Sequence, residues 1–121
     1  MVNIITIPRN EQRYRTVGDW EFNSGELNIK VSKSDSKETD YLIAIHEMIE
    51  AILCQYNGVL STEVDSWDMS HLNHPDPGSI PGCPYYREHM VATMIERLMA
   101  AELQVDWDEH EEILEEQNKK L

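Results

Sequence analysis

A histidine and two glutamates occur within five residues of each other in the string His46-Glu47-Met48-Ile49-Glu50. His46 and Glu50 are four residues apart, so in a helix their side chains emerge on the same side, one turn apart. An imidazole nitrogen and a carboxylate oxygen placed in this way can share a zinc ion. Glu47 points further around the helix, where it could take a proton from a water on that metal. The string predicts either a metal site with a general base or an ordinary helix-surface ion pair.

A third ligand is available later in the chain. His89 is followed by Ala92 and Glu96 on the same face of a helix, and the small Ala92 permits a second helix to approach closely. A catalytic zinc site needs three protein ligands and an open position for water. We therefore expect His46, Glu50 and His89 to hold Zn²⁺ or another divalent transition metal, with Glu47 as the catalytic base. Glu96 could hold the ring of His89 or replace it as the third ligand.

Other polar residues near these two segments have less specific patterns. Asp65 and Asp68 could orient a ligating histidine, although such residues are more often caps or surface charges. His71 and His74 could reach a metal, but histidines in polar loops are usually solvated. Cys83 could be a thiolate ligand, but it lacks a Cys-x-x-Cys partner. We expect these residues to lie outside the metal site.

The first half of the chain reads as β structure followed by one long helix. Residues 1–33 contain a short apolar run stopped by Pro8 and an alternating segment after the turn Asn23-Ser24-Gly25, which is typical of a hairpin. A ligand-bearing helix is expected over 35–57, with Asp35 as its cap and Glu38 completing a capping box. Its apolar arc, expected to face the core, comprises Leu42, Ile45, Ile49, Ile52, Leu53 and Tyr56.

The second half is predicted to be mostly helical. A short helix is expected within 61–72, followed by a Pro/Gly-rich loop over 73–84 that excludes regular structure and could shape a substrate cleft. The second ligand helix is expected over 85–104, with Val91, Ile95, Leu98 and Met99 on its apolar side. The acidic tail over 106–121 is predicted to be a solvated terminal helix, anchored only by Trp107, Ile113 and Leu114.

Length and charge restrict the fold class and the partners. A chain of 121 residues suits one domain, and we expect a single α+β domain over 1–121 with a small β hairpin or sheet packed on a core of two to four helices. The net charge of −13 argues against nucleic acid and anionic membranes as partners. The sequence has no run apolar enough to cross a bilayer and no secretory leader, so a cytoplasmic location is expected.

The order of these parts resembles a known family. A β hairpin, a His-Glu-x-x-ligand helix and a later ligand helix are similar to the minimal zincin-type metallopeptidases of the ImmA/IrrE group. That group has His-Glu-x-x-His with a downstream Glu, whereas here Glu50 replaces the second His and His89 replaces the Glu. The exchange preserves two imidazoles and one carboxylate, so the resemblance implies a zincin-like fold and the same ligand set. The segments 16–20, 46–54, 76–78 and 85–97 are also similar to small uncharacterised phage and bacterial proteins.

Three functions remain open from the sequence. The leading hypothesis is a zinc-dependent hydrolase, possibly a metallopeptidase, that acts on a peptide or another carbonyl substrate. The alternative is an acidic interaction protein without catalysis, which uses its negative charge to occupy a basic protein partner. A third possibility is an all-helical nucleotide pyrophosphohydrolase with Mg²⁺ on Glu47, Glu50 and Glu96, which the β-rich first third and the two histidines oppose.

Overall fold

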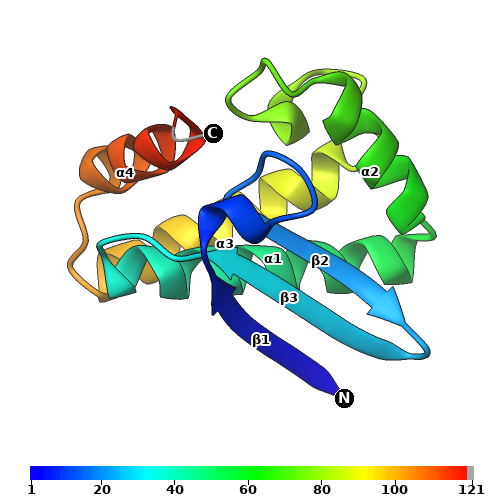
Figure 1. Ribbon diagram of the computed structural model, residues 1–121, viewed down its shortest axis with the longest axis horizontal. Helices are drawn as coiled ribbons and strands as arrows, with labels where there is room; N and C mark the ends of the chain where they lie inside the picture. The colour runs from blue at the N-terminus through cyan, green and yellow to red at the C-terminus, as the bar shows by residue number, and fades with distance from the viewer. Residues whose placement is uncertain (120–121) are drawn as a thin grey trace.

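A three-stranded sheet covers one side of a helical layer. The computed structural model describes residues 1–119, so the last two residues of the predicted tail lie outside the described part. In chain order the strands are β1 (Val2–Ile7), β2 (Gly18–Asn23) and β3 (Glu26–Ser32). The helices are α1 (Lys37–Asn57), α2 (Ser61–Ser70), α3 (Tyr86–Glu102) and α4 (Trp107–Lys119). Short 3-10 turns lie at Arg9–Glu11 and Pro77–Ser79. Figure 1 shows the sheet in front of α1 and α3.

The sheet confirms the predicted hairpin, and the apolar run before Pro8, also predicted as β structure, forms its third strand. β2 and β3 pair antiparallel, with Asn23 opposite Glu26, and the two residues between them have positive φ angles of 51° at Ser24 and 81° at Gly25. Positive φ at both central residues is the geometry of a tight type I′ hairpin turn, which glycine adopts without strain. β1 pairs parallel to β3 on its other side, giving the strand order β1-β3-β2. The mixed sheet confirms the α+β class and contradicts the all-helical alternative.

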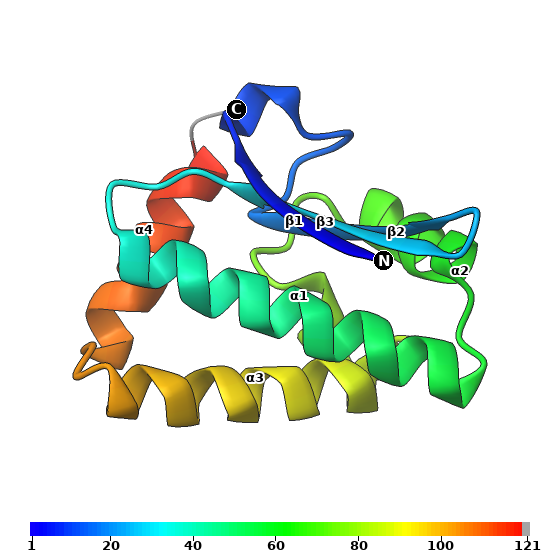
Figure 2. The same cartoon turned by 90° about the horizontal axis from the view of Figure 1, so that it is seen from below.

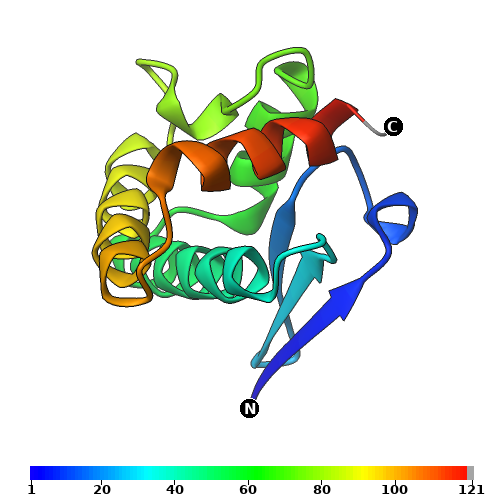
Figure 3. The ribbon, with the colours of Figure 1, turned by 90° about the vertical axis from the view of Figure 1, so that its left-hand side faces the viewer.

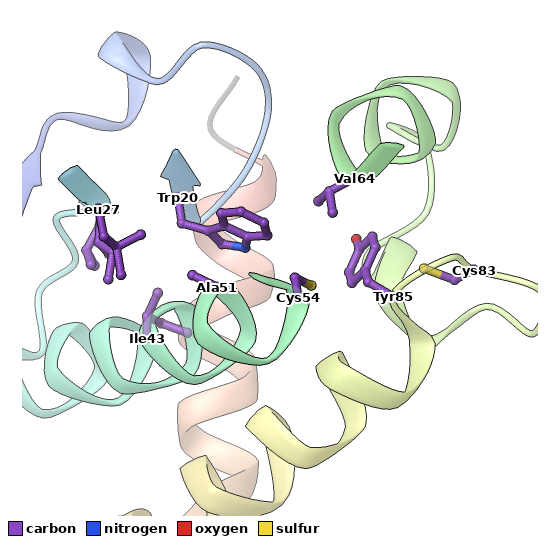
Figure 4. Packing of buried hydrophobic residues seen from close by; sticks show 10 residues of the cluster. Trp20, Leu27, Ile43, Ala51, Cys54, Val64, Cys83 and Tyr85 are labelled. Carbon is purple, nitrogen blue, oxygen red and sulfur yellow. The ribbon is translucent and has the colours of Figure 1, made fainter. Parts of the chain in front are cut away.

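The core lies between this sheet and α1. Leu27, Ile29 and Val31 of β3 are buried against Ile43 and other residues of α1. Figure 4 shows the indole of Trp20 on β2 lying above Ala51 and Cys54, with Tyr85 and Cys83 packed at the far end of the cluster. Both cysteines are buried and free, so the thiol of Cys83 serves as core packing.

Helix α1 begins and packs differently from the prediction. Its N-cap is Ser36, whose hydroxyl accepts the backbone N–H of Thr39 at 3.2 Å, so the assignment of Asp35 as the cap was wrong. The predicted apolar arc is only partly buried, because Leu42 is fully buried whereas Ile52 and Tyr56 are exposed. The buried face instead carries His46, Glu47 and Glu50 among its members. The buried face of α1 is therefore mixed, with these polar side chains beside Leu42 and Ile43.

Helix α3 also buries a face made of polar and small residues. Its buried residues are Glu88, Ala92, Glu96 and Ala100, which recur every four positions. The two alanines let α3 pack antiparallel along α1, as the two helices do in Figure 2, and this confirms the expected role of Ala92. Leu98, expected on the packed side, is 68% exposed.

The C-terminal helix packs more intimately than the prediction of a solvated helix implies. Figure 3 shows α4 lying across the α1–α3 pair. Its acidic residues are exposed, but His110 is fully buried and Gln117 is nearly so. The side-chain amide of Gln117 donates to the backbone carbonyl of Lys33 at 2.8 Å. The backbone carbonyl of Gln117 accepts from Arg9 Nε, also at 2.8 Å. These contacts dock α4 onto the rest of the domain.

The segment between α1 and α3 follows the prediction except for one short turn. The predicted helix within 61–72 is present as α2, while the Pro/Gly-rich loop contains the 3-10 turn Pro77–Ser79. Trp67 of α2 donates its indole N–H to the carbonyl of Pro77 at 2.9 Å, which fixes this turn beneath α2. Within residues 1–119, no helix has both the length and the apolar character needed to cross a bilayer.

Because α1 and α3 pack closely at Ala92, we predict that a larger side chain at this position destabilises the domain. Ala92→Leu should lower the free energy of unfolding by about 1–3 kcal/mol, because Ala92 is completely buried and added methylenes would force the helices apart. Ser66→Leu at an exposed position on α2 is the control and should change it by less than about 0.5 kcal/mol. Urea unfolding curves of both variants give the two free energies of unfolding, and equal values would contradict close packing of α1 against α3 at Ala92.

Candidate metal centre

Three side chains from two helices meet at one buried point. His46 and Glu50 on α1 bring Nε2 and Oε2 to 3.2 Å of each other. His89 on α3 places Nδ1 at 2.8 Å from the same Glu50 oxygen and at 3.2 Å from His46 Nε2. In a tetrahedral zinc site with bonds of about 2.0–2.1 Å, ligand atoms lie about 3.3 Å apart. The spacing and the N, N, O donor set therefore suit a divalent transition metal.

The second polar atom of each of these residues is held by a partner. Nδ1 of His46 lies 2.8 Å from Glu96 Oε1, and Nε2 of His89 lies 2.9 Å from Asp76 Oδ1. A ring nitrogen that faces a carboxylate carries the proton, which leaves the opposite nitrogen with its lone pair. The indole N–H of Trp20 donates to Glu50 Oε1 at 3.1 Å, so Oε2 is the carboxylate oxygen left for the centre. Each residue thus directs its remaining polar atom toward the same point, where the three atoms contact one another.

The chain of contacts continues to α4. The other oxygen of Glu96 accepts from His110 Nε2 at 2.5 Å, and the Thr39 hydroxyl donates to His110 Nδ1 at 3.0 Å. Glu96 and His110 are both buried, so their charges and polar atoms depend on these contacts for compensation. The contacts orient the His46 ring from three helices, because Thr39 lies on α1, Glu96 on α3 and His110 on α4.

The electrostatics of the cluster favour positive charge. Burial alone would lower the pKa of His89, but its contacts with Asp76 and Glu50 outweigh burial and raise the pKa to about 10. The pKa of His46 is likewise raised, because hydrogen bonds to Glu50 and Glu96 outweigh its desolvation. Burial opposes ionisation of Glu50, but the two imidazoles outweigh burial and hold its pKa below the ordinary value. The cluster therefore attracts a cation, whether protons on the rings or a metal ion.

Glu47 lies beside the cluster without joining it. Its Oε2 is 3.9 Å from His46 Nε2, and none of the described residues hydrogen-bonds its carboxylate. Burial, together with the neighbouring charge of Glu50, raises the pKa of Glu47. A cavity of about 540 Å³ adjoins the cluster, and Glu47 lines it together with Trp20, His89 and Trp107. A carboxylate of raised pKa in a cavity has the proton affinity expected of a general base or acid.

Close backbone packing sets the position of the His89 ring. Gly78, in the 3-10 turn Pro77–Ser79, lies against this ring so closely that a Cβ there would come within 2.5 Å of His89 Cγ. Asp76, two residues earlier, accepts from the same ring. The Pro/Gly-rich loop thus fixes His89 from the side opposite Glu50.

The remaining sequence candidates lie outside the cluster. Asp65 pairs with Arg13 at 3.0 Å, and Asp68 accepts from the hydroxyls of Tyr14 and Tyr85, so neither contacts a histidine. His71 stacks on Trp67 with ring centroids 4.1 Å apart. The ring of His74 accepts the backbone N–H of Asp76 at 3.0 Å. Cys83 belongs to the core cluster. Glu96 holds a ligand ring, but the ring is that of His46 instead of His89.

Sequence reasoning missed Asp76, Thr39 and His110. A signal for His110 was present, since Trp107, His110, Leu114 and Gln117 recur with helical spacing and mark an inward face in the acidic helix. No comparable signal exists for Asp76, because only the path of the loop brings it to His89.

The contacts of His110 make it important for stability. His110→Ala should lower the free energy of unfolding by about 2–4 kcal/mol, because it removes a fully buried ring and leaves a Glu96 oxygen unpaired. The exposed His74 provides the control, and His74→Ala should cost less than about 1 kcal/mol. Chemical denaturation of the two variants in metal-free buffer measures the difference, and a neutral His110→Ala would contradict the packing of α4.

Comparison with known proteins adds no relative to this geometry. No protein-family model matches the chain, and neither the curated proteins nor the solved structures include a significant match. The resemblance to minimal zincin-type metallopeptidases therefore stays a prediction.

Proposed function

We propose that the protein is a zinc-dependent hydrolase with His46, Glu50 and His89 as metal ligands and Glu47 as the general base. One observation carries this proposal: the three ligand atoms lie 2.8–3.2 Å apart, while the other polar atom of each residue is occupied by Glu96, Trp20 or Asp76. Carboxylate partners on ligating histidines are a recurring feature of zinc sites because they fix the tautomer and increase ligand basicity.

The ligand set fits a catalytic ion better than a structural one. Three protein ligands leave a fourth position, and the adjoining cavity gives that position access to a small molecule or chain segment. Zinc, when bound, acidifies a water molecule and polarises a carbonyl group. Glu47, which lines this cavity beside the ligands, would take the proton from that water and return it to the leaving group. Peptides and other carbonyl compounds are the corresponding substrate class.

The Mg²⁺ alternative has less support. Magnesium prefers several oxygen ligands, but both oxygens of Glu96 are taken by His46 and His110. Glu50 offers a single free oxygen, and it faces two imidazole nitrogens. An N, N, O set favours zinc and its transition-metal neighbours over magnesium.

Metal content is the direct test of the ligand set. Protein purified without chelator and dialysed with zinc should hold one equivalent per chain by elemental analysis. His46→Ala and His89→Ala should each weaken zinc binding more than about a hundredfold, because loss of even a second-shell partner costs up to about that factor. His71→Ala should bind zinc normally. Stoichiometry well below one equivalent in the parent protein, or equal affinity in the His46 and His71 variants, rejects the site.

The role of Glu47 separates hydrolysis from metal binding. Glu47→Gln keeps the shape of the side chain but cannot accept the proton, so it should retain zinc while slowing cleavage of a pool of internally quenched peptides by about 10²–10⁴-fold. Glu63→Gln, on exposed α2, is the control and should cleave at the parental rate. If zinc is bound but the parent protein cleaves no faster than Glu47→Gln, the hydrolase assignment is wrong and only the metal site survives.

A further inference from the structure

Part of the apolar arc that the sequence places on α1 lies outside the buried core, although Leu42 at one end of the arc is fully buried. Ile45, Ile49, Ile52 and Tyr56 alternate spacings of four and three residues, which is the heptad pattern of a helix that packs against another helix. In the structure Ile45 and Ile49 are half-buried, Ile52 is 38% exposed and Tyr56 is 84% exposed. A stripe of this periodicity on an outward face lacks a partner helix within the described chain.

Helix α3 continues the same surface. Val91, Met94 and Leu98 also follow spacings of three and four, and Met94 and Leu98 are 60% and 68% exposed. α1 and α3 run side by side, and in the view from below no other helix lies in front of them (Figure 2). We call these seven residues, Ile45, Ile49, Ile52, Tyr56, Val91, Met94 and Leu98, the outer helical face.

Two exposed charged residues lie in line with the α3 part of the outer helical face. Arg87 and Glu102 extend the Val91-Met94-Leu98 stripe by one turn in each direction. Both residues are exposed. One end of this stripe is therefore basic and the other is acidic.

We propose that the outer helical face is the interface of a homodimer, in which α1 and α3 of two copies pack antiparallel around a two-fold axis to form a four-helix bundle. An axis that lies across the helices sets Arg87 of one copy beside Glu102 of the other, and symmetry repeats the pair. An axis parallel to the helices would place α3 of one copy over α1 of the other, so Arg87 and Glu102 would not meet. This charge pattern favours a second copy of the same chain as the occupant.

The area is adequate for such a dimer. Measured between its charged ends, Arg87 and Glu102, the α3 stripe spans about 16 residues and is about 24 Å long at 1.5 Å per residue. Over that length two adjoining helices, each about 10 Å wide, present on the order of 500 Å². Pairing two copies would remove about 1000 Å², which reaches the lower limit of specific interfaces. The inference does not depend on the proposed metal, but it has a consequence for it, since the dimer would brace both ligand-bearing helices from outside.

The test is the oligomeric state of the full chain by sedimentation equilibrium over about a hundredfold range of concentration. The parent protein should be a dimer, and Met94→Glu should raise the dimer dissociation constant at least about tenfold, because symmetry buries two added carboxylates. Met69→Glu is the matched control, since Met69 is 49% exposed on α2, away from this face, and it should dimerise like the parent. The circular dichroism spectra of both variants should match that of the parent protein, which checks that both variants fold.

A charge exchange tests the antiparallel arrangement. Arg87→Glu and Glu102→Arg should each weaken the dimer about threefold or more, and combining them should restore it because the pair is re-formed with reversed polarity. A monomeric parent protein, or a dimer that Met94→Glu leaves intact, overturns the interface. A double variant as weak as the sum of the single variants overturns the two-fold arrangement.

Discussion

A single buried carboxylate, that of Glu96, ties together the parts of this domain that form the centre. One of its oxygens accepts from His46 on α1 and the other from His110 on α4, while Glu96 itself belongs to α3. A carboxylate removed from water must find charge-assisted hydrogen bonds, because leaving it unpaired costs several kcal/mol. The shared contact therefore requires all three helices to be in register at once. Thr39 extends the requirement to the first turn of α1 through the second nitrogen of His110. The ring of His46 is oriented by this arrangement, and so is the nitrogen that it presents to the centre.

Polar residues inside the helical layer explain why several large apolar residues of both long helices lie on the outside. His46 and Glu50 of α1, and Glu96 of α3, need buried partners that only the facing helix supplies. Small residues such as Ala92 and Ala100 bring the helices close enough for those hydrogen bonds. Large side chains such as Ile52 and Leu98 would hold the helices apart at this seam, and they occupy the opposite side. The orientation of α1 and α3 about their own axes brings the polar residues of the centre together and also leaves the outer helical face exposed. The two features therefore share one physical cause.

The sheet and the Pro/Gly-rich loop over 73–84 also contact the residues of the centre. Trp20 contributes both apolar area to the core and an N–H to Glu50, so the hairpin has a packing role and a positioning role at one residue. The turn at Gly78 allows the chain to approach the ring of His89, and Asp76 holds that ring. With these partners in place, His46, Glu50 and His89 already converge on one point, and preorganisation of this kind is what the proposed metal site would require.

The sequence alone determined the local features: the hairpin around Ser24-Gly25, the two long helices, the small seam residue Ala92, and the choice of His46, Glu50 and His89 as a group. These follow from periodicity, turn chemistry and the i, i+4 rule, which depend on neighbours in the chain. The tertiary structure decided which face of each helix is inside, that Glu96 serves His46, and that Asp76 and His110 complete the centre. Periodicity identifies a stripe but cannot say whether the domain's own core or another surface covers it. Hydrogen-bond partners that are 50 or 71 residues apart, as for Glu96 with His46 and His110 with Thr39, are set by packing and leave no trace in local spacing.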